Sequence, residues 1–183
     1  MGRKYAIRNQ EEFYFVTFTV VGWIDVFVRQ EYRNILLDSI KYCQQEKGLL
    51  IGAWCIMTSH MHMAIGTNGQ MPLEHIVRDL KSYTARHIRK YIEASPYESR
   101  KEWMMTIMKQ AGEQKSNNKD FQFWQQHNHP IGLSDITITK QRVDYIHNNP
   151  VTAGFVDKPT DWLFSSARDY EDEKGLLEIE FLY

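Results

Sequence analysis

Apolar and polar positions follow a strand–helix–strand–strand–helix order over the first half of the chain. β-branched and aromatic residues crowd the run Phe13–Val21, which is typical of a central strand. Apolar residues recur every three to four positions in two longer stretches, which indicates amphipathic helices. The expected elements are strands over 13–21, 49–57 and 60–66 and helices over 30–47 and 72–94. This order predicts an α+β fold, an antiparallel sheet with helices packed on one face.

The second half of the chain carries weaker patterns. A helix over about 140–148 is predicted to stop there, because Pro150 disfavours helical backbone at Asn149. The other expected elements are a helical piece over 98–111, a polar loop over 112–120, a short strand over 121–124, a helical turn near 165–170 and a terminal strand over 177–182.

Composition narrows the class of protein. The chain has 183 residues, of which 43% are hydrophobic, so we expect one globular domain spanning 1–183. Its formal net charge of -1 means that any basic surface must be local. The two cysteines, Cys43 and Cys55, fit no disulfide or metal-ligand spacing, and no signal peptide precedes them, so we expect a cytoplasmic protein. No apolar run approaches the ~20 residues of a membrane span.

Two histidines stand two positions apart inside an apolar run. Residues i and i+2 of a strand point to the same face, so His60 and His62 should present two imidazoles side by side while Met61 faces the core. Two neutral imidazoles make half of a divalent-metal site. The alternative is a pair of partly buried polar residues on a sheet.

Tyr145 and Asn149 lie at positions i and i+4 of the predicted helix. Such residues share one helix face, so a phenol and an amide oxygen could reach one site, with Asn149 as a third metal ligand. The alternative, a buried tyrosine and an asparagine at a helix end, is favoured when this segment is taken alone. His147 should project elsewhere.

Basic residues recur along the helix over 72–94. Arg78, Lys81 and Arg89 repeat at helical spacing, and residues 78–102 carry a local excess of three positive charges. This pattern suits contacts to phosphates, and we predict DNA binding there. A solvated helix face explains it equally well.

Together, these residues resemble the single-tyrosine transposases of the HUH superfamily, and within them the REP-associated branch. The strongest matches are the block Ala53–His62 and the block Tyr145–Gly154. Further matches, in the same order, are Phe15–Phe18, Arg78–Ser82, Phe123–Gln125 and Trp162–Ala167. Thr58-Ser59 departs from the residues common in the family before the first histidine, which changes a turn and leaves the ligands intact.

The resemblance implies a ferredoxin-like fold and metal-dependent cleavage and strand transfer of single-stranded DNA through a 5′-phosphotyrosine intermediate. It assigns metal ligation to His60, His62 and Asn149 and the nucleophile to Tyr145. The cofactor would be a divalent metal ion, Mg²⁺ or Mn²⁺, and the partner single-stranded or hairpin DNA. Bases of such DNA stack on aromatic rings. The stacking candidates are Trp54, Trp103, Phe123 and Trp124.

Two other functions stay open at this point. One is a domesticated protein that binds hairpin DNA without turnover; the other is a metal-dependent hydrolase in which Tyr145 is structural. The sequence also leaves open whether the chain acts as a monomer or a homodimer.

Overall fold

A four-stranded antiparallel sheet forms the centre of the molecule. The computed structural model describes residues 7–113 and 121–183. The strands are β1 (Tyr14–Thr19), β2 (Leu49–Ile56), β3 (His60–Thr67) and β4 (Ile131–Gly132). They lie in the order β2-β3-β1-β4, and each neighbouring pair is antiparallel.

Helices connect these strands in the pattern of a split βαβ unit. The helices are α1 (Gln30–Lys47), α2 (Leu73–Ala94), α3 (Lys101–Glu113) and α4 (Ile136–Thr152). Short 3₁₀ turns cover Val21–Trp23, Val26–Val28, Pro159–Asp161 and Asp169–Glu171. Strand β3 inserts between β1 and β2, which is the ferredoxin-like arrangement. The predicted α+β fold class is confirmed.

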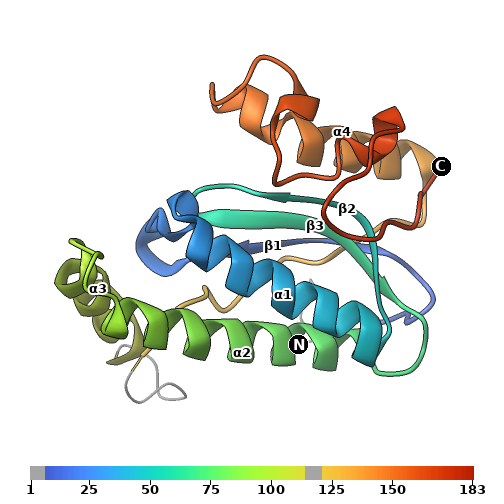
Figure 1. Cartoon of the computed structure of the whole chain (residues 1–183). Coiled ribbons are helices and arrows are strands. Elements are labelled where there is room, and N and C mark those ends of the chain that lie inside the picture. The colour runs from blue at the N-terminus through green and yellow to red at the C-terminus, as the bar shows by residue number, and fades with distance from the viewer. Residues whose placement is uncertain (1–6, 114–120) are drawn as a thin grey trace.

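The two faces of the sheet bury different sets of residues. Val16, Phe18 and Met63 belong to the larger core, which α1 and α2 cover (Figure 1). Phe15 and Ala64, whose side chains alternate with those, belong to a smaller core with Val143 and Ile146 of α4. Helices α1 and α2 thus pack on one face, as expected, and α4 lies over the opposite face (Figure 1).

Helix α4 is longer at both ends than the sequence predicted. Its first turn is capped by Asp135, whose carboxylate accepts hydrogen bonds from the backbone N–H groups of Thr137 and Ile138. The prediction that the helix stops before Pro150 was wrong, because the helix runs on to Thr152. Pro150 is buried and its carbonyl accepts a hydrogen bond from the N–H of Phe155, so packing and the following turn offset the lost proline donor.

Three weaker expectations are also corrected. The strand expected over 121–124 is reduced to a single bridge between Trp124 and Val20. Residues 177–182 form no strand, although Glu180 donates a backbone hydrogen bond to Ile51 of β2. The turn expected near 165–170 is a 3₁₀ turn over Asp169–Glu171.

The polar loop expected over 112–120 lies, beyond residue 113, outside the described residues. Within the described ranges, no helix is both long enough and apolar enough to cross a membrane.

Candidate active site

His60 and His62 lie on β3, and their rings touch. Their ring centroids are 4.8 Å apart with an interplanar angle of 76°. Both side chains share the face of β3 that α4 covers, since His62 contacts Phe15 of the smaller core and Tyr145 of α4. Met61 is fully buried in the opposite core, as strand alternation requires.

A hydroxyl group holds one nitrogen of each histidine. Thr17 on the neighbouring strand places its Oγ1 2.8 Å from Nδ1 of His62, and Ser59 places its Oγ 3.1 Å from Nδ1 of His60. Such contacts fix the orientation of a ring and leave Nε2 as the nitrogen that could coordinate a metal ion. Nε2 of His62 is buried and has no hydrogen bond of normal geometry.

Burial keeps both imidazoles neutral. Desolvation lowers the pKa of His60, and it lowers the pKa of His62 to about 3 with a smaller contribution from the nearby His60. A hydrogen-bonding contribution from Asn149 opposes this and raises the pKa of His62. Neutral imidazoles are the form that binds metal ions, so the pair is ready to coordinate at neutral pH.

The side chain of Asn149 completes this cluster. Its Nδ2 donates a 2.7 Å hydrogen bond to the backbone carbonyl of Tyr145, which leaves the amide oxygen to face His62. Among the described residues, no group of three or more His, Cys, Asp or Glu side chains could hold a metal ion. Within the part of the chain that the structure describes, His60 and His62 therefore have no third side chain of these types beside them, and another candidate ligand atom there is the Asn149 oxygen. Two imidazoles and one amide oxygen suit a divalent cation.

Tyr145 lies beside this cluster on α4. Its ring centroid is 5.1 Å from that of His62, and its side chain is 47% exposed. Phe15 stacks on His62 at 5.6 Å and meets the edge of Tyr145 at 5.9 Å, so one buried ring positions both. The structure thus brings together the four residues that the sequence analysis assigned to one site, although more than eighty positions separate the histidines from Tyr145 and Asn149.

Arg142 is a member of this site that the sequence analysis missed. It lies one helical turn before Tyr145, and its guanidinium carbon is 5.1 Å from the ring centre of Phe15. The i, i+3 spacing to Tyr145 was the available signal, because it puts both residues on one helix face.

His147 lies away from the cluster, as predicted. It is buried, its Nε2 is 2.8 Å from Oγ of Ser166, and its ring meets the edge of Tyr170 at 5.0 Å. Burial lowers its pKa to about 4. His147 therefore anchors the C-terminal segment to α4.

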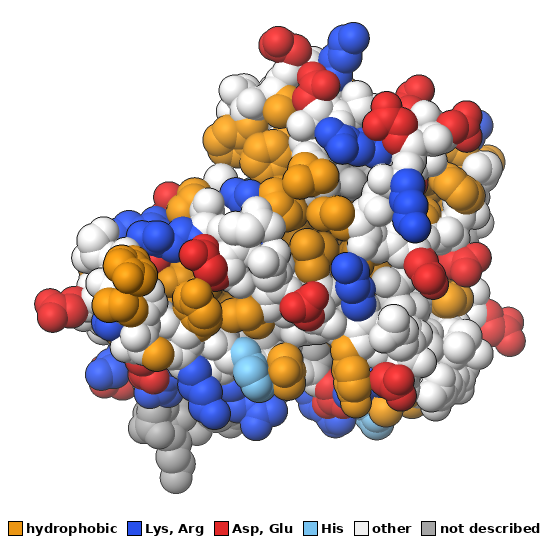
Figure 2. All heavy atoms as spheres, in the orientation of Figure 1, with side chains coloured by type: hydrophobic (Ala, Val, Ile, Leu, Met, Phe, Trp, Pro, Cys, Tyr) orange, Lys and Arg blue, Asp and Glu red, His pale blue; other side chains and the backbone are white. Residues whose placement is uncertain are grey.

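The basic residues of α2 lie on the other face of the sheet. Lys81 is partly buried and donates hydrogen bonds to the carbonyl of Gln125 at 2.8 Å and to the side chain of Asn128 at 2.6 Å. Burial lowers its pKa to about 8, so it stays mostly protonated at neutral pH. Arg78 and Arg89 lie nearer the surface and form ion pairs within the helix, with Asp79 and Glu93. Figure 2 shows Lys and Arg side chains gathered along the lower rim, over α2.

Three of the four stacking candidates belong to the core. Trp54, Phe123 and Trp124 are each at most 5% exposed, whereas Trp103 on α3 is 51% exposed. Trp23, which the sequence analysis did not consider, is 61% exposed and meets His60 edge-on with ring centroids 5.4 Å apart.

Residues 24–107, which include the histidine pair, match the family described as "Transposase IS200 like". This stretch of the chain is similar to the IS200-like transposases. The resemblance predicted from the motifs is confirmed.

One solved structure shares this fold. A REP-associated tyrosine transposase bound to a REP hairpin superposes with a TM-score of 0.61 at 16% sequence identity, covering 100% of this chain and 94% of that one. A transposase candidate from Deinococcus radiodurans R1 gives a TM-score of 0.42 at 18% identity, covering 81% and 95% of the two chains. No match was found among curated proteins.

Proposed function

We propose that this protein cleaves and rejoins single-stranded DNA, with a divalent metal ion as cofactor and Tyr145 as nucleophile. The observation that carries the proposal is the cluster around His62. The neutral imidazole of His62 is buried and lies beside a second imidazole, an amide side chain and an accessible phenol. A metal ion at Nε2 of His62 would satisfy this buried atom, which makes no hydrogen bond of normal geometry within the described part of the protein.

His60, His62 and Asn149 would hold the metal ion. When bound there, a divalent cation supplies a Lewis acid that polarises a phosphate oxygen and helps hold the scissile phosphate in line with the nucleophile. Thr17 and Ser59 keep the two rings turned toward it by holding their Nδ1 atoms.

Tyr145 would form the covalent bond. Its phenolic oxygen attacks the phosphorus and gives its proton to solvent, which reaches this half-exposed side chain. The bond to the 3′-oxygen breaks, and that oxygen takes up a proton as it leaves. The product is a phosphodiester to tyrosine of similar energy, so a free 3′-hydroxyl can attack it and restore the DNA without ATP.

Arg142 would bind the phosphate beside the metal ion. A guanidinium donates several hydrogen bonds in a fixed plane that matches phosphate oxygens. Its position one turn before Tyr145, over the ring that also touches His62, puts this charge beside the reacting group. It would stabilise the negative charge that the transition state carries.

Single-stranded DNA as substrate rests on two supports. Residues 24–107 match the IS200-like transposases, and the similar solved transposase is bound to a REP hairpin. A folded hairpin can be recognised by shape, while its unpaired flanks are free to enter the site.

A labelled single-stranded oligonucleotide carrying a hairpin tests the proposal. We expect a covalent protein–DNA adduct with Mn²⁺ or Mg²⁺, and we expect Tyr145→Phe to abolish the adduct while leaving DNA binding nearly intact. Tyr83→Phe is the matched control, because Tyr83 is also 47% exposed but lies on α2. Adduct formation by Tyr145→Phe would assign the nucleophile elsewhere. Free 5′-phosphate without adduct would indicate a hydrolase, and binding without either product a DNA-binding protein.

A further inference from the structure

Trp23 is an exposed tryptophan beside a predicted metal ligand. Its side chain is 61% exposed, although its neighbours Ile24 and Val26 are at most 1% exposed. Its ring meets the edge of His60 at 5.4 Å and 74°. Exposed aromatic rings are common on this protein, but this one lies against a candidate metal ligand, where a bound nucleic acid could reach it.

The backbone at this tryptophan is held in an unfavourable conformation. Gly22 and Trp23 have φ angles of 63° and 54°, and only glycine adopts this left-handed region without cost. Residues with side chains in such conformations cluster at ligand sites, where the surrounding structure holds them in place.

Two sets of contacts hold the segment 20–29 that carries Trp23. Its backbone N–H groups at Val20 and Phe27 donate hydrogen bonds to the carbonyls of Ser59 and Thr58, in the turn just before His60. On the other side, Gly22 packs so closely on Ile107 of α3 that an added Cβ would lie 2.9 Å from its Cγ2.

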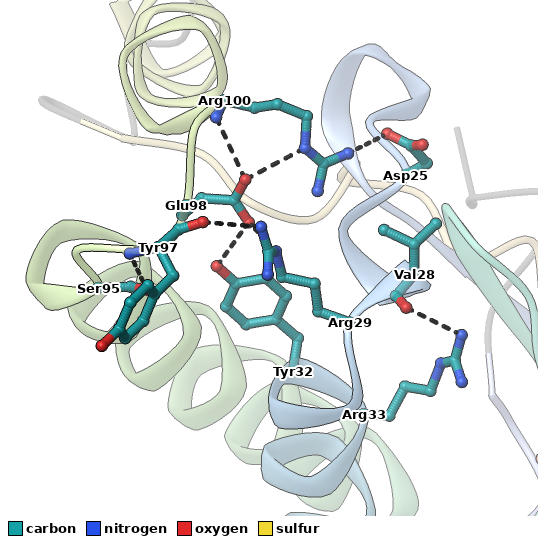
Figure 3. A network of polar contacts seen from close by, with 9 residues as sticks. All are labelled: Asp25, Val28, Arg29, Tyr32, Arg33, Ser95, Tyr97, Glu98 and Arg100. Atoms are coloured by element: carbon teal, nitrogen blue, oxygen red, sulfur yellow. Dashed lines mark hydrogen bonds and ion pairs between the residues drawn. The ribbon is translucent and has the colours of Figure 1, made fainter.

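A buried carboxylate fixes the far end of the same segment (Figure 3). Glu98, whose side chain is fully buried, binds Nε of Arg29 at 2.8 Å, the hydroxyl of Tyr32 at 3.0 Å and Nε of Arg100 at 3.2 Å. Arg100 also forms a 2.8 Å ion pair with Asp25, two residues after Trp23. These contacts hold the segment that carries the exposed Trp23 ring on both sides of this residue.

Trp23 is also connected to Tyr145 through the two histidine rings. Successive ring contacts run from Trp23 to His60, from His60 to His62 and from His62 to Tyr145, at 5.4, 4.8 and 5.1 Å. The histidine pair is in the middle of this series of contacts, with the proposed nucleophile at one end and the tryptophan at the other. A strand with its phosphate at the histidines would have a neighbouring nucleotide over Trp23.

We propose that Trp23 is a stacking platform for an unpaired base next to the scissile phosphate. The proposal rests on the proposed function, and it names a stacking residue that was not among the four candidates taken from the sequence. Stacking on an aromatic ring tolerates any base, since every base has a π-face. The platform would hold the single strand against the metal site and exclude paired DNA, whose bases are already stacked.

The test compares two probes with the same number of phosphates, a dT 20-mer and a 20-mer of abasic nucleotides. Binding is measured by fluorescence anisotropy in the Tyr145→Phe background, so that no cleavage occurs. We expect Trp23→Gly to weaken binding of the dT 20-mer about 5- to 100-fold and to leave binding of the abasic 20-mer unchanged. Trp23→Phe should retain most of the affinity for the dT 20-mer.

Folding is controlled within the same set of variants. Glycine adopts a φ of 54° freely, so Trp23→Gly should unfold at a temperature no lower than the starting protein. Tyr42→Ala removes another exposed ring, on α1 across the sheet, and should bind both probes unchanged. Equal binding of the dT 20-mer with and without Trp23 would overturn the proposal.

The two proposals fail in different ways. Weaker binding of the dT 20-mer by Trp23→Gly, with unchanged binding of the abasic 20-mer, supports the stacking proposal whether or not an adduct forms. Failure to form an adduct would contradict only the strand-transfer chemistry. If the protein forms the adduct normally and Trp23→Gly binds the dT 20-mer as tightly as the starting protein does, only the stacking proposal is wrong.

Discussion

Single residues decide whether the histidine pair can serve as a metal site. The Thr17 hydroxyl lies on β1, opposite His62 in the antiparallel register, so the pairing of β1 with β3 itself aims the ring. Nδ1 must carry the proton and donate it to Thr17 if Nε2 is to bind a cation. The Thr17 hydroxyl can accept that proton, so its position is compatible with the tautomer that the proposed function needs.

We predict that Thr17→Val lowers Mn²⁺ affinity about 10- to 100-fold, because the ring loses the group that orients it. Isothermal titration calorimetry of the variant measures this. Thr106→Val is the control, since Thr106 is exposed on α3 and bonds only its own helix. Unchanged Mn²⁺ affinity in Thr17→Val would show that the hydroxyl does not orient His62.

His147 predicts how stability depends on pH. Its folded pKa of about 4 is below its ordinary value of 6.5, so the unfolded chain binds the proton more readily. The stability contributed by its neutral form is complete above pH 6.5 and is lost as the pH falls toward 4. At pH 5 the loss is about 2 kcal/mol.

Urea unfolding of His147→Gln at pH 7 and pH 5 measures this contribution. The variant keeps a group able to bond Ser166 but cannot titrate, so its free energy of unfolding should fall by about 2 kcal/mol less than that of the unaltered protein. Equal losses in the two proteins would mean that His147 does not drive the acid sensitivity.

At the scale of elements, the sequence predicted which residues share a face within one strand or helix, but it did not predict the contacts between elements. Alternation placed His60 and His62 on one face, and helical spacing put Tyr145 and Asn149 on one side of α4. The predicted end of α4 was wrong, because burial of Pro150 outweighs the tendency of proline to end a helix. Trp23 went unnoticed, because its exposure follows from contacts of segment 20–29 with α3 and with Glu98, far along the chain.

Helix α2 gives a prediction about salt. If Arg78, Lys81 and Arg89 all contact phosphates, replacing all three with alanine should flatten the log–log salt dependence by about two, at roughly 0.7 for each contact. Lys81 already binds Gln125 and Asn128, so its replacement should also lower stability. The exposed ion pairs of Arg78 and Arg89 are weak enough to exchange for phosphates.

The double variant Arg78→Ala/Arg89→Ala is therefore the cleaner measurement. We expect its slope for single-stranded DNA to flatten by about 1.4 while all sequences weaken about equally. Binding titrations at several salt concentrations measure the slope. A slope unchanged from that of the starting protein would show that this helix face is only solvated.

At the scale of the whole molecule, α4 determines where the chemistry takes place. The sequence could not say which face of the sheet this helix covers, because its apolar residues fit either core. The fold places it opposite α1 and α2, so the histidines and Tyr145 meet within one chain. DNA that contacts α2 and enters the site must then pass around the sheet rather than across one surface.

This arrangement predicts catalysis in cis. Tyr145→Phe lacks the nucleophile and His62→Ala lacks a metal ligand, so each variant alone should form no adduct. If Tyr145 serves the histidines of its own chain, as the 5.1 Å ring separation suggests, no active site in a mixture of the two variants is complete. The adduct assay on the mixture should then detect no adduct at any ratio.

Adduct in the mixture would mean that two chains exchange α4, because only an exchanged helix unites an intact Tyr145 with an intact His62. The quantity that decides between a self-sufficient monomer and an obligate dimer is therefore adduct formed per chain in the mixture, measured against the unaltered protein at the same concentration.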